Sequence, residues 1–170
     1  PLEALMAKYP YTLDLNTSFS GDDNLYVRLR SGNGDANVFG NKDYGTYLSS
    51  DSSKYADEMN VDKIWYTFPV GENNTIWIGP KIENYYMHAT APSIYKPVLK
   101  QFTLGGNGAA YGASTKLGAG WAYKADNGFA ISSNVVSNTS DPLANSAVSW
   151  ATQVGLTKPQ YSASIMLNQK

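Results

Sequence analysis

The chain of 170 residues has no cysteine and a single histidine, His88. Without cysteine it has neither a disulfide framework nor a thiolate metal site. One imidazole with no acidic cluster near it in the sequence does not make a metal site either, because such sites need several ligands. We therefore expect no metal ion and no other cofactor.

Charge is also scarce. Charged residues make up 16% of the chain, against about 25% in a typical soluble domain. The net charge of −1 gives no basic surface of the kind that nucleic-acid binding requires. We therefore expect no nucleic-acid partner.

Long apolar runs are missing as well. None approaches the roughly 18 residues that a membrane-spanning helix needs, which excludes helical membrane proteins. A transmembrane β-barrel is still compatible with the sequence, because its strands alternate in hydropathy. The first residues, PLEALMAKYP, lack a charged region followed by an apolar stretch, so no signal peptide is visible.

Catalytic motifs are weak. The chain has no cysteine nucleophile, and its one histidine cannot be assigned a particular serine and aspartate from the sequence. The glycine-rich GGNG at 105–108 does not stand between a strand and a helix, as a phosphate-binding loop would. We expect that the protein is not an enzyme.

Aromatic residues and alternating polarity are what the chain does have. Aromatics make up 13% of the residues, with 13 Tyr and 4 Trp. Alternation of apolar and polar side chains is typical of β-strands. It recurs at 11–19, 25–30, 61–68, 75–79, 116–124, 129–137, 148–156 and 161–168. The sequence therefore predicts an all-β, antiparallel protein.

The connections between these runs are of two kinds. Short polar turns (SGDDN, PVGENN, ADNG and TKPQ) join them in pairs, whereas long irregular stretches such as 31–60 and 80–115 separate the pairs. Outer-membrane barrels sort their connections in this way, and runs of about nine to eleven residues suffice to cross a bilayer at the usual tilt. This organisation favours an antiparallel transmembrane β-barrel of the outer-membrane type.

Aromatic residues flank the short turns. They lie on the apolar phase of their runs, as expected for rings at a membrane–water interface. An alternative is that bulky residues close the end of a soluble core. The candidate interface residues are Phe19, Phe68, Tyr123, Phe129 and Tyr161.

The two runs of 116–137 illustrate the expected faces. The apolar phase, which we expect to face lipid, comprises Leu117, Trp121, Tyr123, Phe129, Ile131 and Val135. The other phase carries Lys116, Lys124, Ser132 and Asn134, which we expect to face a wet interior. Small residues at 118, 120 and 122 (Gly118, Gly120 and Ala122) would keep that inner wall thin.

Charged and polar side chains on the inward phase are candidates for lining a pore. There they would set the local field and bias which ions pass. The alternative is a solvated wall in which arginine and aspartate pair. The candidates are Asp14, Asn16, Arg28, Arg30, Lys63, Lys116 and Lys124. The stretch 80–115 either folds into the lumen and narrows it or packs outside as an external loop.

Several segments resemble a known family. LDLNTSFSGDDNLYVRLRSGN and VDKIWYTFPVGENNTIWIGP resemble the first hairpins of cyanobacterial outer-membrane porins, the iron uptake porins grouped with the carbohydrate-selective porins. GGNGAAYGASTKLGAGWAYK and the later SDP loop are similar to the following segment. The resemblance implies a barrel of about sixteen strands, of which this chain covers roughly half. It also implies an S-layer-homology domain, which is not visible here.

We therefore expect residues 1–170 to be the porin β-barrel region of a larger outer-membrane channel. Such a channel passes inorganic ions and small hydrophilic solutes by diffusion, sits in the outer membrane of a Gram-negative-type, cyanobacterial cell and contacts its lipid. A homo-oligomer, such as a trimer, is compatible with the sequence. The alternative is a secreted β-sandwich that binds carbohydrate through exposed tryptophans: Trp65, Trp77, Trp121 and Trp150.

Overall fold

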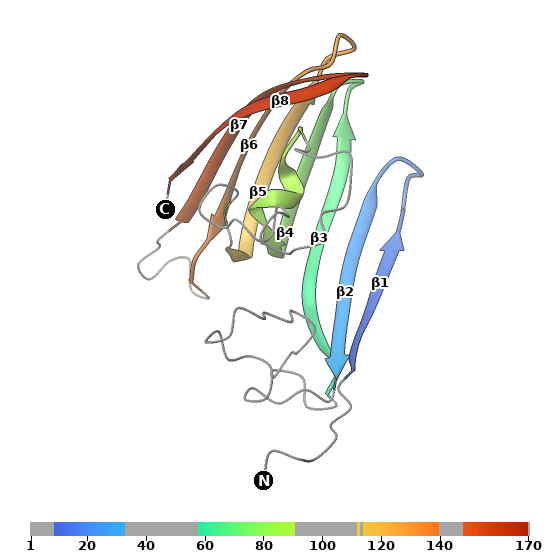
Figure 1. Ribbon diagram of the computed structural model, residues 1–170. Helices are drawn as coiled ribbons and strands as arrows, with labels where there is room; N and C mark the ends of the chain where they lie inside the picture. Colours follow the sequence, from blue (N-terminus) through green and yellow to red (C-terminus); the bar gives the residue numbers. More distant parts are fainter. Residues whose placement is uncertain (1–8, 33–57, 91–111, 113, 140–147, 170) are drawn as a thin grey trace. The chain divides into compact units, whose positions relative to one another are not determined.

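The computed structural model of the protein describes residues 9–32, 58–90, 112, 114–139 and 148–169. These residues form one sheet of eight strands that follow one another in chain order, β1 to β8 (Figure 1). The predicted all-β, antiparallel architecture is confirmed. The sheet is not closed into a barrel in the part of the chain that the structure describes.

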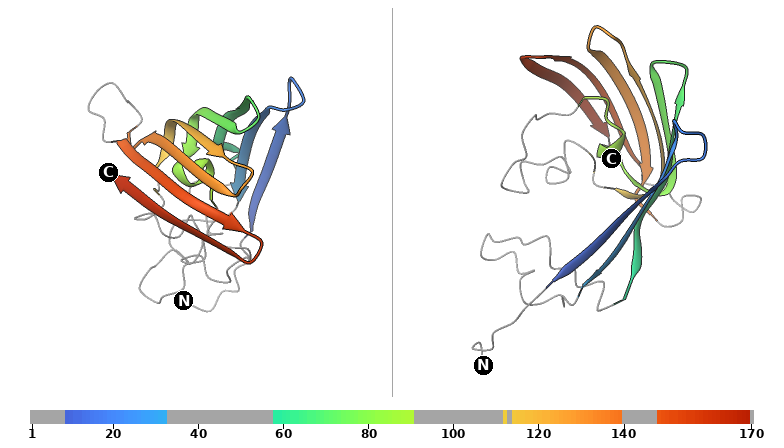
Figure 2. Two further views of the ribbon diagram at one scale, coloured as in Figure 1. Left: turned by 90° about the horizontal axis from the view of Figure 1, so that it is seen from above. Right: turned by 90° about the vertical axis from the view of Figure 1, so that its right-hand side faces the viewer.

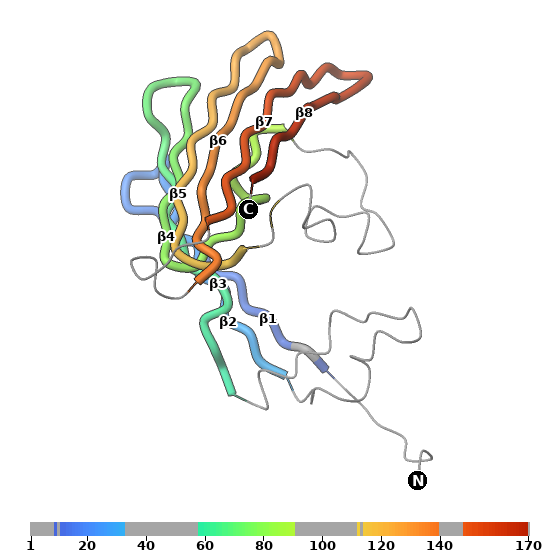
Figure 3. Tube along the Cα trace, turned by 90° about the vertical axis from the view of Figure 1, so that its left-hand side faces the viewer, coloured from blue at the N-terminus to red at the C-terminus, as the bar shows by residue number. Residues whose placement is uncertain are grey.

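The strands match the alternating runs closely. Their bounds are β1 (Pro10–Thr17), β2 (Asn24–Gly32), β3 (Asn60–Val70), β4 (Asn74–Glu83), β5 (Thr115–Lys124), β6 (Phe129–Ser137), β7 (Val148–Lys158) and β8 (Tyr161–Gln169). A 3-10 turn, η2 (Asn84–Met87), follows β4 directly. The short connections β3–β4, β5–β6 and β7–β8 lie at the same end of these strands (Figure 3).

Contacts divide the chain into two units. The first comprises residues 1–15 and 27–62, and the second comprises 16–26 and 63–170. The second unit contains β4 to β8 in full, and it also contains η2.

The β5–β6 hairpin shows why these residues form strands joined by a tight turn. The register runs without interruption from Lys124 opposite Ala130 to Gly118 opposite Val136. Gly128 adopts a φ of 88°, a left-handed conformation that glycine reaches without steric cost. The Asn127 side chain accepts a hydrogen bond from the Phe129 backbone N–H at 2.9 Å. The predicted Asp-Asn-Gly turn is confirmed.

The end of β4 differs from the prediction. The irregular stretch was expected to begin at Pro80, but β4 continues to Glu83. Proline has no N–H to donate to a ladder, and it is tolerated inside a sheet at bulges. The register shifts between Gly79 and Ile82, so a bulge accommodates Pro80 and the strand resumes beyond it.

The core of the second unit lies on one face of its sheet. Trp65, Ile82, Met87 and Val136 form a buried apolar cluster. η2 packs on this face against β4, β5, β6 and β7 (Figure 2). Gly120 makes this close approach possible, because a Cβ there would come within 2.6 Å of the Met87 sulfur. The face that η2 covers is called the inner face below, and the opposite one the outer face.

Candidate functional site: an apolar outer face and a hydrogen-bonded inner face

The outer face of β4 to β8 is apolar and exposed. Paired residues of neighbouring strands form rows across this face. One such row consists of Ile78, Ala119, Val135 and Trp150. Trp150 is 54% exposed and Ile165 is 76% exposed. The exposed large apolar residues of this face are Ile78, Leu117, Trp121, Phe129, Val135, Val148, Trp150, Val154, Tyr161, Ile165 and Leu167.

The tryptophans of the outer face bond to side chains of the same sheet. The indole N–H of Trp121 donates to the Asn74 side-chain oxygen at 2.9 Å, and that of Trp150 donates to the Ser133 hydroxyl at 2.9 Å. Ser133 is in turn 3.0 Å from the Thr152 hydroxyl. The two indole N–H groups and the Ser133 hydroxyl therefore have hydrogen-bond partners within the sheet and do not need water, although the surface around them is exposed.

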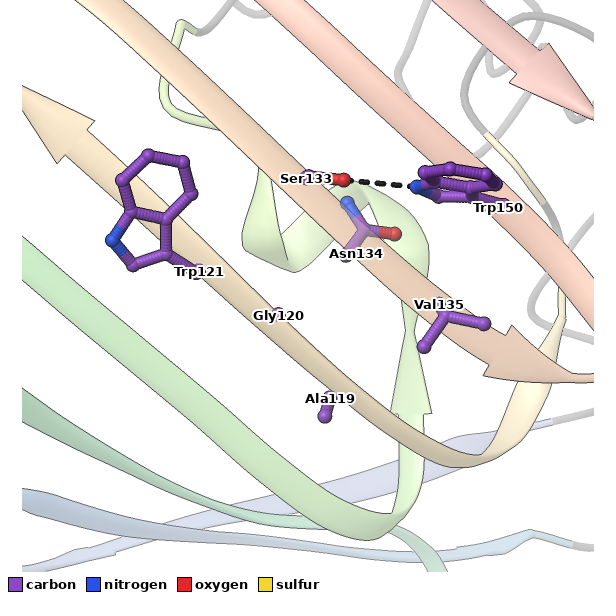
Figure 4. A pocket seen from close by; sticks show the side chains of 7 residues that line it. All are labelled: Ala119, Gly120, Trp121, Ser133, Asn134, Val135 and Trp150. Carbon is purple, nitrogen blue, oxygen red and sulfur yellow. Dashed lines mark hydrogen bonds between the residues drawn. The ribbon is translucent and has the colours of Figure 1, made fainter.

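Trp121 and Trp150 flank a shallow depression on the outer face (Figure 4). Ala119, Gly120, Ser133, Asn134 and Val135 line it between the two indole rings, and the Asn134 side-chain oxygen is bonded to Asn84. Because the indole N–H groups and the Ser133 hydroxyl are already paired, the depression presents mainly apolar surface.

The inner face buries polar side chains in addition to its apolar cluster. Ser132, Asn134, Ser149 and Gln153 are buried, with exposures between 0% and 3%. They lie under residues 84–90, which bring their own hydrogen-bonding groups. Polar side chains are normally exposed unless they are hydrogen-bonded. The sheet of the second unit therefore buries polar side chains beside its apolar cluster on the inner face and exposes large apolar side chains on the outer face.

Hydrogen bonds fix residues 84–90 on the inner face. The Ala89 N–H donates to the Ser132 hydroxyl at 3.0 Å, and the Thr90 N–H donates to the Gln153 side-chain oxygen at 2.9 Å. The Gln153 side-chain N–H returns a bond to the Thr90 carbonyl at 2.9 Å. The first residues of the predicted stretch 80–115 thus lie on the inner face, whereas 91–111 fall outside the described residues.

A buried ion pair stands at the start of this segment. The Lys63 ammonium lies 2.6 Å from Glu83, and the two side chains are 7% and 17% exposed. The Thr115 hydroxyl donates to the other Glu83 oxygen at 2.7 Å. Lys63 also lies over the Tyr86 ring, at 5.4 Å from its centre. Lys63 is therefore on the expected phase of its strand but is enclosed and paired.

The other candidate pore-lining residues lie at separate places. In the first unit, the Arg28 guanidinium donates to Asp14 at 2.7 Å, and Arg30 is half-buried. In the second unit, Asn16 accepts a bond from the Asn24 side chain at 2.9 Å. At the ends of β5, Lys116 is half-buried and Lys124 is exposed.

The candidate interface aromatics lie at or near the short turns. Phe129 and Tyr161 begin their strands and are exposed, while Phe68 and Tyr123 are half-buried near the ends of theirs. Phe19 lies in the β1–β2 turn rather than in β1, and it is 73% exposed. Its ring centre is 6.2 Å from that of Tyr66.

Asp23 organises the β1–β2 turn. Its carboxylate accepts bonds from the hydroxyl and N–H of Ser20, from the Phe19 N–H and from the Tyr66 hydroxyl at 2.5 Å. These bonds, that of the Ser20 hydroxyl first, hold the pKa of the Asp23 carboxyl well below its ordinary value. The turn is therefore built around a charged carboxylate. The sequence signalled a turn here but not this role.

The sequence also did not identify the polar anchors of the inner face. Asn84, Thr90 and Gln153 contact partners that are 50 to 65 positions away in the chain. No local feature of the sequence indicates these distant partners.

Comparison of the chain with protein-family models, curated proteins and solved structures finds no match. Among the described residues, no helix is long and apolar enough to cross a membrane. The same residues contain no group of three or more His, Asp or Glu placed to hold a metal ion.

Proposed function

We propose that the chain forms wall strands of an outer-membrane β-barrel channel that passes inorganic ions and small hydrophilic solutes by passive diffusion. The observation that supports this most is the burial pattern of the second unit, in which large apolar side chains such as Trp150 and Ile165 are exposed on the outer face while polar Ser132 and Gln153 are buried on the inner face. Lipid replaces water as the neighbour of an apolar outer face in such a protein. The segment similarity to cyanobacterial outer-membrane porins points in the same direction.

The pairing of polar groups on the outer face adds a second argument. A hydrocarbon environment has no water to bond to, so each polar group there needs a partner within the protein. Trp121, Trp150, Ser133 and Thr152 have such partners. In water this pairing would carry little advantage, since solvent serves the same groups.

In this proposal the inner face meets the aqueous lumen, and the segment 84–90 reduces the free cross-section there. Free edges of a sheet are not stable in hydrocarbon, so β1 and β8 require neighbouring strands in the membrane. In this proposal the intact barrel supplies those neighbouring strands. The partners of the channel are outer-membrane lipid, ions and small hydrophilic solutes.

The alternative is a secreted carbohydrate-binding domain, and the depression between Trp121 and Trp150 is the observation in its favour. Sugars stack on indole rings, but a sugar site also needs polar groups to bond the hydroxyls. In this depression the indole N–H groups and Ser133 are already bonded within the sheet. The lipid-facing assignment therefore fits the depression better.

Planar-bilayer conductance of the full-length protein in detergent tests the proposal. We expect stable stepwise currents, and the reversal potential under a salt gradient reports the ion preference. A protein that stays monodisperse without detergent and gives no current would contradict the channel and favour the carbohydrate-binding alternative.

A further inference from the structure

The outer face of β5 to β8 carries one charged residue among its described positions, Lys158. Lys158 stands at the β7–β8 turn, opposite Tyr161. The next row of the face contains Phe129, which pairs with Leu156. Tyr161 and Phe129 are both exposed. A single cation therefore stands among exposed aromatic rings at the short-turn end of an otherwise uncharged face.

The Lys158 ammonium is held in place but is not neutralised. It donates to the backbone carbonyl of Asn127 at 2.7 Å. An ammonium has three N–H donors, so two remain for another acceptor. No ion pair joins it to a carboxylate of the described residues, including Asp126 in the neighbouring turn. Lys158 is thus an exposed, fixed cation that can bind an anion.

An apolar track leads from Lys158 to the depression that Figure 4 shows between Trp121 and Trp150. Two rows of the outer face lie between them, and no charged side chain interrupts these rows. The first row consists of Phe129, Leu156 and Ala163, and the second of Tyr123, Ile131, Val154 and Ile165. The row that follows contains Trp121, which borders the depression.

The length of this track matches one leaflet of a bilayer. Trp121 lies in one row with Ser133 and Thr152, and Thr152 precedes Lys158 by six residues on β7. Six residues of strand span about 20 Å, and a tilt of about 45° reduces this to a depth of roughly 14 Å. The hydrocarbon core is about 30 Å thick, so one leaflet contributes about 15 Å. With Lys158 at the level of the headgroups, the depression therefore lies where the acyl chains of that leaflet end.

A phospholipid has the two features that this surface complements. Its phosphate is an anion for the Lys158 ammonium, and its acyl chains need an apolar path. In the depression, the indole N–H groups of Trp121 and Trp150 and the Ser133 hydroxyl are bonded within the sheet, so they require no polar partner from a ligand. A cation at one end and apolar surface at the other therefore favour a lipid over a sugar, which would need polar groups in the depression.

We propose that the outer face binds one phospholipid at a defined site, with its phosphate on Lys158 and the end of one acyl chain in the depression between Trp121 and Trp150. Tyr161 and Phe129 flank the headgroup. This site rests on the proposed placement of the outer face in a membrane. It adds a particular lipid position, where that placement alone predicts only general contact with lipid.

Native mass spectrometry of the full-length protein in a non-ionic detergent measures its affinity for dioleoylphosphatidylglycerol. Lys158→Gln keeps an N–H donor for the Asn127 carbonyl but removes the charge. The affinity should therefore fall about fivefold, the effect of one lysine near an anionic surface. Lys158→Arg should retain the affinity. Lys124→Gln is the matched control and should change nothing, because Lys124 is exposed at the same short-turn end but lies on the inner phase.

A second pair of variants tests the depression. Ala119 lines it, whereas Val148 is exposed on the same face outside it and farther from Lys158. Ala119→Phe fills the depression and should lower the affinity roughly tenfold, the effect of losing about two buried methylene groups. Val148→Phe should leave the affinity unchanged. Glycerol phosphate, which has the headgroup but no acyl chain, should not displace the lipid.

The lipid site would be overturned by equal affinities within either pair of variants, by displacement with glycerol phosphate, or by a wild type that retains no lipid. Planar-bilayer conductance tests the channel separately. Stepwise currents from a protein without this lipid dependence would overturn the site and keep the channel. The same lipid dependence in a protein that gives no current would overturn the channel and keep the site.

Discussion

Ile165 and Ser164 are neighbours on β8 that point to opposite faces of the sheet, and both are exposed. This makes them a matched pair for an arginine substitution. Ile165 pairs with Val154 on the outer face, and it is 76% exposed. It lies four residues from Tyr161 at the β7–β8 turn, roughly 13 Å along the strand. In a bilayer this position is well inside the hydrocarbon core, which is about 30 Å thick.

The two accounts of the outer face predict different costs for Ile165→Arg. If the face is covered by lipid, the arginine should lower the free energy of unfolding by about 2–4 kcal/mol. If the face is in water, an exposed substitution usually changes it by no more than about 0.5 kcal/mol. Ser164→Arg removes an acceptor of a 3.2 Å bond from Gln153, which should cost about 1 kcal/mol or less in either case.

Urea titration of the protein refolded into phospholipid vesicles, followed by tryptophan fluorescence, measures both variants. The lipid-facing account predicts a clearly lower midpoint for Ile165→Arg than for Ser164→Arg. Equal midpoints, or a larger loss for Ser164→Arg, would refute the assignment of the outer face to lipid.

Three further predictions concern the inner face and the first turn. Lys63→Met leaves the buried Glu83 carboxylate without its ion-pair partner, so a urea titration should show a free energy of unfolding lower by about 3–5 kcal/mol. The double variant Lys63→Met/Glu83→Leu should recover most of this loss. The carboxylate of Asp23 has a lowered pKa in the folded protein, so its stabilising effect should be present above the unfolded pKa of about 3.9 and be lost as the pH falls below it. Hydrogen exchange of the turn amides should therefore be faster in Asp23→Asn than in wild type at pH 7. Gly155→Ala places a Cβ against the Thr90 side chain, so hydrogen exchange of the Thr90 amide should become faster. An unchanged exchange rate would contradict the close packing of residues 84–90 on the sheet.

The strands could be predicted because their signals are local. The alternation of 116–124 and 129–137 and the Asp-Asn-Gly turn between them specify the hairpin, its register and its two faces. The extension of β4 past Pro80 could not be predicted, because it depends on a bulge that the neighbouring strand accommodates. Where the end of a strand depends on pairing with its neighbour, the local sequence does not determine it.

The covering of the inner face could not be predicted either. The bonds that join Ala89 to Ser132 and Asn84 to Ser149 connect residues 43 and 65 positions apart. The sequence offered two places for the stretch 80–115, in the lumen or outside. The alternation of the run 61–68 predicted that Lys63, a candidate pore-lining residue, points inward. It could not predict that Glu83 forms an ion pair with Lys63.

Fluorescence quenching by brominated phospholipids tests the lipid-facing assignment most directly. The protein is reconstituted into vesicles whose acyl chains carry bromine, and the wild type is compared with the double variant Trp121→Phe/Trp150→Phe. The account predicts strong quenching of the wild type, loss of the quenched component in the double variant and weak quenching of that component by aqueous acrylamide. Quenching by acrylamide but not by brominated chains would show that these tryptophans face water, and would contradict the account.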